Sequence, residues 1–135
     1  MKRAGFTMIE LIFVIVILGI LSAVALPKFI GVSEQAEAGK CKAFIGTLNR
    51  TVGSSIWSDM VLNDKNASAA FTAASITNQI EVPAKCGVTA AELAGMAAGT
   101  GSAKQGIAIG GGTYDINASV ATTSVAPVWS WTKTN

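Results

Sequence analysis

The stretch Gly5-Phe6-Thr7-Met8-Ile9-Glu10-Leu11 opens an apolar segment in which Glu10 is the only charged residue before Lys28. If this segment enters a membrane, an ionised carboxylate within it costs at least about 2.5 to 3.5 kcal/mol, so a functional partner is expected for it. Cleavage after Gly5 would create a new α-amine at Phe6. That amine is our candidate partner for Glu10.

The apolar segment itself, residues 6–26, has the length of a single membrane span. As a helix rising 1.5 Å per residue it measures about 31 Å, which matches a hydrocarbon core of roughly 30 Å. Lys2 and Arg3 precede it and favour a cytoplasmic amino terminus, although Lys28 on the far side weakens this charge asymmetry. The sequence therefore predicts one membrane span.

The amino-terminal residues resemble those of type IV pilin-like proteins, which have a short basic leader ending in glycine before a Phe-Thr-x-x-Glu start. The resemblance is specific over roughly residues 2–29. It implies that a prepilin peptidase cleaves between Gly5 and Phe6 and methylates the Phe6 amine. It also implies that Glu10 pairs with the Phe6 amine of a neighbouring subunit during filament assembly. Met8 stands where leucine is common in the family, which is a conservative departure.

The expected fold is α+β, a long amino-terminal helix with a hydrophobic first half packed on a small antiparallel sheet of three to four strands. The predicted regions are a prepilin leader at 1–5, a transmembrane and filament-core helix at 6–26, an amphipathic continuation of that helix at 27–60 and a globular variable region at 61–135. Within the last region we expect a short helix at 89–98, a hairpin of 105–109 and 113–116 around Gly110 to Gly112, and a final strand at 128–132.

The amphipathic part of the helix carries one apolar stripe, which is expected to cover the sheet. Its members recur at spacings of three and four: Cys41, Phe44, Ile45, Leu48, Val52 and Ile56. At about 100° per residue, Gly39, Gly46 and Gly53 fall near the opposite face. Each helical glycine costs roughly 1 kcal/mol relative to alanine, so we interpret this face as a contact with helices of neighbouring subunits. Glycines merely tolerated in a helix supported by its other face are the alternative.

Gly19 and Pro27 mark the expected weak part of the helix. Pro27 has no N–H to donate to the carbonyl of Ala23, and Gly19 adds a flexible point. The resemblance implies local unwinding between such a glycine and proline in filaments. A fixed kink without functional change is the alternative.

The two cysteines, Cys41 on the stripe and Cys86 in a loop at 81–86, are predicted to form a disulfide in a periplasmic or extracellular setting. Closing a loop of about 46 residues stabilises a fold by roughly 4 kcal/mol in the chain-entropy model. This pairing differs from the common pilin pattern, in which the cysteines lie near the carboxyl end. Two buried free thiols are the alternative.

Two further motifs, Asn66-Ala67-Ser68 and Asn117-Ala118-Ser119, are N-x-S glycosylation acceptors with an acid two residues before the asparagine. Some bacterial oligosaccharyltransferases require that acid, which Asn49-Arg50-Thr51 lacks. Asn66 and Asn117 are therefore candidate glycosylation sites. Chance occurrence is the alternative, because Ser and Asn are abundant.

Enzymatic chemistry is not indicated. The chain has no histidine, its acids are scattered without a calcium-loop spacing, and Gly110 to Gly112 is not followed by the Lys-Ser or Lys-Thr of a phosphate loop. We expect no cofactor, no metal and no catalytic residues. Removing Lys2 and Arg3 with the leader reduces ten basic residues to eight, which balances the eight acids. No bulk nucleic-acid binding is therefore expected.

The predicted function is that of a structural pilin subunit that waits in the inner membrane and then forms a surface filament. Its expected partners are copies of itself, the prepilin peptidase and a pilus or secretion assembly platform. The first alternative is a pseudopilin of a type II secretion system, whose major subunits often carry a calcium site. The remote alternative is a secreted soluble binding domain, released by signal peptidase at Ala23-Val24-Ala25 with a mature start at Leu26.

Overall fold

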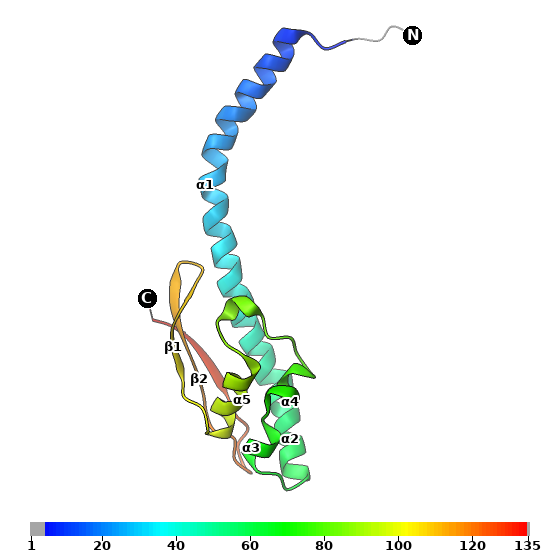
Figure 1. Ribbon diagram of the computed structural model, residues 1–135, viewed down its shortest axis with the longest axis vertical. Coiled ribbons are helices and arrows are strands. Elements are labelled where there is room, and N and C mark those ends of the chain that lie inside the picture. The colour runs from blue at the N-terminus through cyan, green and yellow to red at the C-terminus, as the bar shows by residue number, and fades with distance from the viewer. Residues whose placement is uncertain (1–4, 135) are drawn as a thin grey trace. The chain divides into compact units, whose positions relative to one another are not determined.

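The computed structural model describes residues 5–134, apart from the side chain of Ile30. The chain divides into two compact units, Met1–Ser33 and Glu34–Asn135. The first unit is helical over nearly all of its described residues. The second holds helices and a three-stranded antiparallel sheet, so the predicted α+β class is confirmed (Figure 1).

One continuous helix runs from Met8 to Leu62. Its first part, α1, spans Met8–Thr47 and contains Pro27 without a break. A π-helical segment, η1, follows over Leu48–Gly53, and α2 completes the helix over Ser54–Leu62. The predicted long amino-terminal helix is thus confirmed, and it extends slightly beyond the expected end.

The π-helical segment explains how four core side chains spaced four residues apart share one face. In a regular α-helix three such steps would rotate the last side chain by about 120° from the first. A turn with i→i+5 bonds contains one extra residue, which reduces that 120° rotation by about 100°. Leu48, Val52, Ile56 and Met60 are accordingly all buried.

The sheet consists of β1 (Lys104–Ile109), β2 (Gly112–Ala118) and β3 (Trp129–Lys133) in that spatial order. β1 and β2 form the predicted hairpin. Gly110 and Gly111 make its two-residue turn with φ of 56° and 71°, which is the backbone conformation of a type I′ turn. Ile107, Ile109 and Ile116 alternate along the strands and enter the core.

Four short elements connect the long helix to the sheet: α3 (Ala67–Ala70), α4 (Ala73–Thr77), the 3₁₀ turn η2 (Ala84–Cys86) and α5 (Ala90–Ala98). The predicted helix at 89–98 is α5. It begins with a capping box between Thr89 and Glu92 and ends at Gly99, whose φ is 75°. Helices α3 and α4 were not predicted, because four or five residues carry no helical periodicity.

Trp129 lies where the helix, the connecting elements and the sheet meet. Its side chain is 1% exposed, and its indole Nε1 donates a hydrogen bond to the Leu93 carbonyl at 3.1 Å. Its ring lies 6.2 Å from that of Phe71, in a tilted arrangement. Asn49 on the helix donates to the Trp129 carbonyl at 2.8 Å and accepts from the Trp129 N–H at 2.7 Å, which fixes the start of β3 against η1.

The structure contains a disulfide between Cys41 of α1 and Cys86 of η2, and both residues are 1% exposed. Lys85 approaches Glu37 at 3.5 Å in an exposed ion pair beside it. The covalent bond therefore joins the connecting region to the amphipathic part of the helix within the second unit.

Candidate functional site

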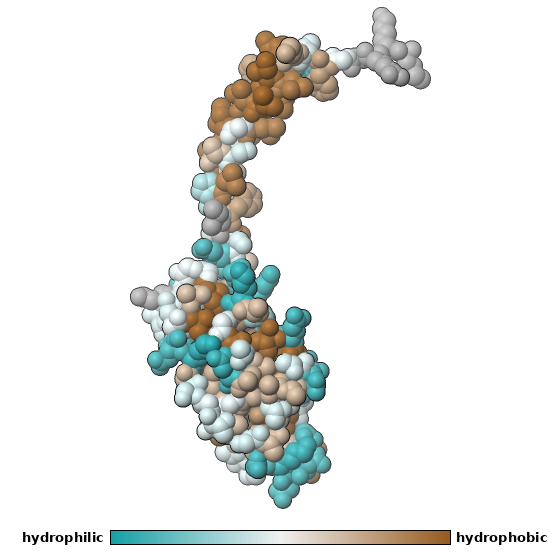
Figure 2. All heavy atoms as spheres, in the orientation of Figure 1, coloured by the Kyte–Doolittle hydropathy of each residue, from teal (hydrophilic) through white to brown (hydrophobic). Residues whose placement is uncertain are grey.

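The candidate site is the amino-terminal half of α1, which presents apolar side chains on every side. Figure 2 shows this segment as a nearly continuous hydrophobic surface. Ile17 is the least exposed large apolar side chain from Met8 to Leu26 at 48%, and Met8 is the most exposed at 86%. An ordinary core helix buries one stripe, so this segment requires an apolar environment outside the chain. By length and composition it can cross a membrane.

Glu10 lies in the first turn of α1 and forms a capping box with Thr7. The Glu10 N–H donates to the Thr7 hydroxyl at 3.3 Å, while the Thr7 hydroxyl and N–H donate to the Glu10 carboxylate at 3.3 and 3.5 Å. A carboxylate here also faces the positive end of the helix dipole. This role was not predicted from the sequence, although Thr-x-x-Glu before an apolar run is its usual signature.

Gly5 and Phe6 precede the helix and are exposed, with Phe6 at 83%. The bond between them therefore lies in a segment outside regular structure, as access by a peptidase requires. The basic residues Lys2 and Arg3 lie outside the described residues. The pairing of Glu10 with a Phe6 amine involves a second subunit and remains a prediction.

The expected flexible segment between Gly19 and Pro27 is helical in this single chain. The Ser22 hydroxyl donates to the Leu18 carbonyl at 2.7 Å, one helical turn earlier. Such bonds back to the preceding turn slightly weaken a helix. Unwinding of this segment on assembly therefore remains a prediction.

The three glycines assigned to one outer face separate in the structure. Gly39 and Gly46 are exposed, and a Cβ added to either would meet nothing within 4 Å. Gly46 also lines a shallow hollow with Ala43, Thr47, Arg50 and Thr51. Gly53 is instead buried, and a Cβ there would lie 2.6 Å from a ring carbon of Trp129.

The placement of Gly53 on the outer face was therefore wrong. The extra residue of the π-helical turn rotates every later side chain by about 100° relative to a regular helix. That rotation carries Gly53 from the outer face to the core. Its missing side chain makes room for the Trp129 ring within the same chain.

Among residues 5–134, no group of three or more cysteine or acidic side chains is placed to hold a metal ion. Two exposed acids have a lowered pKa. Hydrogen bonding to Lys104 is the main cause for Glu92, and hydrogen bonding to Lys65 is the main cause for Asp59. Both form surface ion pairs, at 2.7 Å, and lie far along the chain from the amino-terminal segment.

Comparisons with known proteins agree with this location of the site. The family described as the prokaryotic N-terminal methylation motif matches residues 1–26. The type IV narrow pilus major component PilA5 of Thermus thermophilus is 49% identical over 43 residues. That match spans 32% of this chain and 37% of the length of PilA5. No solved structure matches the chain. The resemblance to the type IV pilin-like family is therefore confirmed, and its support comes from these local matches.

Proposed function

We propose, from the premise of a type IV pilin-like amino-terminal segment, that this chain is a structural subunit of a type IV pilus-like filament. The observation that carries the proposal is the exposed apolar half of α1 with a single carboxylate at its start. Lipid surrounds these apolar side chains before assembly. In a filament core, the equivalent helices of other copies bury them. No catalytic role is included in this proposal.

Processing is the first step. A prepilin peptidase cleaves between Gly5 and Phe6 and methylates the new amine. Exposure of both residues, before the first helical residue Met8, supports access to that bond. Until assembly, residues 6–26 hold the chain in the inner membrane as a single span with its amino terminus in the cytoplasm.

Assembly then joins each subunit to copies of itself on a pilus or secretion platform. Glu10 of one subunit pairs with the methylated Phe6 amine of a neighbour, which neutralises a carboxylate that is otherwise costly in an apolar filament core. Glu10 also caps its own helix through Thr7. A carboxylate has two oxygens and several lone pairs, so it can accept both sets of hydrogen bonds.

Two further features of the helix support close packing of subunits. Gly39 and Gly46 are two exposed positions of α1 without side-chain bulk, where another helix can approach. Gly19 and Pro27 bound the segment that we propose to unwind when the helix enters the filament. Gly53 is left out of this contact because it is buried against Trp129.

The proposal is tested by intact mass and amino-terminal sequencing of protein sheared from the surface of cells. A start at Phe6 carrying one methyl group is expected in the sheared fraction. A start at Leu26 in a soluble monomer would overturn the proposal in favour of a secreted domain.

The second candidate is a pseudopilin of a type II secretion system, which shares the amino-terminal motif. It predicts the same methylated Phe6 in cell membranes but little of the protein in the sheared fraction. The match to a pilus major component favours the surface filament.

A further inference from the structure

The three N-x-S/T motifs of the chain lie in three different structural settings. Asn49 lies in the π-helical segment, Asn66 precedes a short helix and Asn117 lies in the central strand. N-linked glycosylation modifies the amide nitrogen Nδ2 of an accessible asparagine, usually in a surface loop. The structure thus separates motifs that look alike in the sequence.

Asn49 uses both ends of its amide to hold Trp129. Nδ2 donates to the Trp129 carbonyl at 2.8 Å, and Oδ1 accepts from the Trp129 N–H at 2.7 Å. Asn49 is also half-buried. Transfer of a sugar to Nδ2 would break this contact at the centre of the core, so Asn49 has a structural role.

Asn117 is exposed, but its motif is held by the sheet. Asn117 is paired with Ser130 of β3, and the Ser119 N–H and hydroxyl form hydrogen bonds with the Val128 carbonyl and N–H, at 3.0 and 2.8 Å. The acid of this motif, Asp115, is also engaged, because its carboxylate accepts from the Gly106 N–H at 2.9 Å. Opening this segment disturbs pairing at Ile116, which is fully buried.

Asn66 differs from Asn117 in its backbone setting, although within residues 5–134 neither residue donates a hydrogen bond from Nδ2. The residues from Asn63 to Asn66 are all exposed and form the connection from α2 to α3. Asn66 is the N-cap of α3, with only its Oδ1 engaged, by the Ala69 N–H at 2.8 Å. In the described part of the chain no hydrogen bond is donated by its Nδ2, and no ion pair involves Asp64, the acid two residues earlier.

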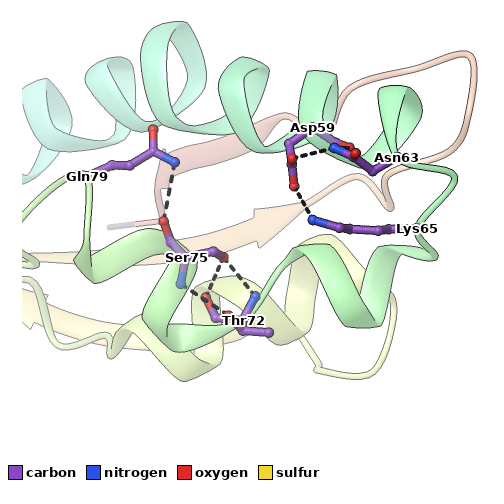
Figure 3. A network of polar contacts seen from close by, with 6 residues as sticks. All are labelled: Asp59, Asn63, Lys65, Thr72, Ser75 and Gln79. Carbon is purple, nitrogen blue, oxygen red and sulfur yellow. Dashed lines mark hydrogen bonds and ion pairs between the residues drawn. The ribbon is translucent and has the colours of Figure 1, made fainter.

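The connection that carries Asn66 is also held in shape. The Lys65 ammonium contacts the Asp59 carboxylate at 2.7 Å, and the Asn63 amide donates to the same carboxylate at 2.7 Å (Figure 3). Asp64 adopts φ of 50° in this turn. These contacts present Asn66 at the surface beyond the end of α2, while Ser68 in the first turn of α3 is also exposed.

We infer that Asn66, and neither Asn49 nor Asn117, is an acceptor for an N-linked glycan. The donor class is a lipid-linked oligosaccharide diphosphate. A bond forms between Nδ2 and the anomeric carbon of the first sugar, and the bond from that carbon to the diphosphate oxygen breaks. One amide proton passes to a base of the transferase, and the lipid diphosphate leaves. Oδ1 of Asn66 remains a carbonyl oxygen, so the modified residue still caps α3.

The test uses the full chain in bacterial cells that contain an N-oligosaccharyltransferase and its lipid-linked oligosaccharide, with intact mass as the readout. We expect the wild type to gain one glycan mass. Asn66→Asp keeps a capping oxygen but has no amide nitrogen. Ser68→Ala removes the hydroxyl of the motif. Neither variant should gain the glycan mass. Asn117→Gln should keep it.

The inference is overturned if Asn66→Asp retains the glycan, or if the wild type gains a second glycan that Asn117→Gln removes. It is also overturned if the wild type stays unmodified in cells where a control acceptor protein is modified. Because the readout is mass, none of these outcomes depends on whether the chain forms filaments. The proposed function can therefore fail while the acceptor site holds, and the reverse is also possible.

Discussion

The two parts of one continuous helix differ in where their apolar side chains find a partner. From Met8 to Leu26 every large apolar side chain is exposed, whereas from Cys41 to Met60 the apolar side chains form a single buried face. The apolar side chains of the second part are covered by the chain's own sheet and connecting elements. The apolar side chains of the first part are not covered by the described chain, so this part needs an apolar environment outside it, whereas the second part builds the fold.

The largest expected effect is on filament yield, and it comes from substituting Glu10 in the first part of the helix. We expect both Glu10→Ala and Glu10→Gln to reduce filament yield to background while the chain still inserts in the membrane, because neither supplies a charge for the Phe6 amine. Filament yield is measured in cells whose other subunits are unchanged. Glutamine can replace glutamate in a capping box, so it serves as the matched control. If Glu10→Gln formed normal filaments and Glu10→Ala did not, the role of Glu10 would be helix capping and not pairing with the Phe6 amine.

Removing the disulfide should weaken only the second part. We expect the paired change Cys41→Ser and Cys86→Ser to lower the free energy of unfolding by about 4 kcal/mol. The loop it closes spans 45 residues in sequence. Chemical denaturation of the full chain in detergent, followed by Trp fluorescence, gives this value. A loss below about 1 kcal/mol would mean that the residual structure of the unfolded chain already holds these segments together.

A matched pair of leucines compares the two parts directly. Leu48 is fully buried, so Leu48→Ala should cost about 2 to 5 kcal/mol of unfolding free energy. Leu18 is 55% exposed, so Leu18→Ala should change the same quantity by less than about 0.5 kcal/mol. The measurement is again denaturation in detergent. Equal losses from the two variants would contradict the division into an outward and an inward part.

The smallest expected effect concerns the cap of α5. The Lys104 ammonium lies 2.7 Å from Oε1 of Glu92, and the Thr89 N–H donates to Oε2. These hydrogen bonds lower the pKa of Glu92 below its ordinary 4.5. The resulting stabilisation is present above pH 4.5 and is lost as pH falls through the lowered pKa. Because the pair is exposed, we expect less than about 1 kcal/mol.

Unfolding free energy as a function of pH measures this contribution. Lys104→Gln removes the main cause of the shift and should reduce the acid-dependent loss. An unchanged loss at low pH in that variant would show that other carboxylates dominate the acid response.

Local signals in the sequence predicted a large part of this structure. The 6–26 apolar run and the three glycines between the expected strands of the hairpin each specify an element without help from distant residues. The disulfide is a different case, because only two cysteines were available to pair.

Contacts between distant residues explain what the sequence did not predict. The bonds from Asn49 to Trp129 join residues 80 positions apart, and no local pattern indicates them. The π-helical segment had a weak signal in the four-residue spacing of Leu48, Val52 and Ile56, which we interpreted as ordinary helical spacing. The error at Gly53 follows from that interpretation. The contact of Glu10 with a second subunit is not a property of one chain, so it remains a proposal.

The Cys41–Cys86 disulfide also has a mechanical consequence for a filament that is pulled. In the filament proposed above, tension would enter the chain through its helix, and the 45-residue span between the cysteines could lengthen only if that covalent bond broke. Fully extended, such a span would add about 150 Å of chain. The bond would therefore limit the extension of each loaded chain and keep α2 and the connecting elements from unravelling.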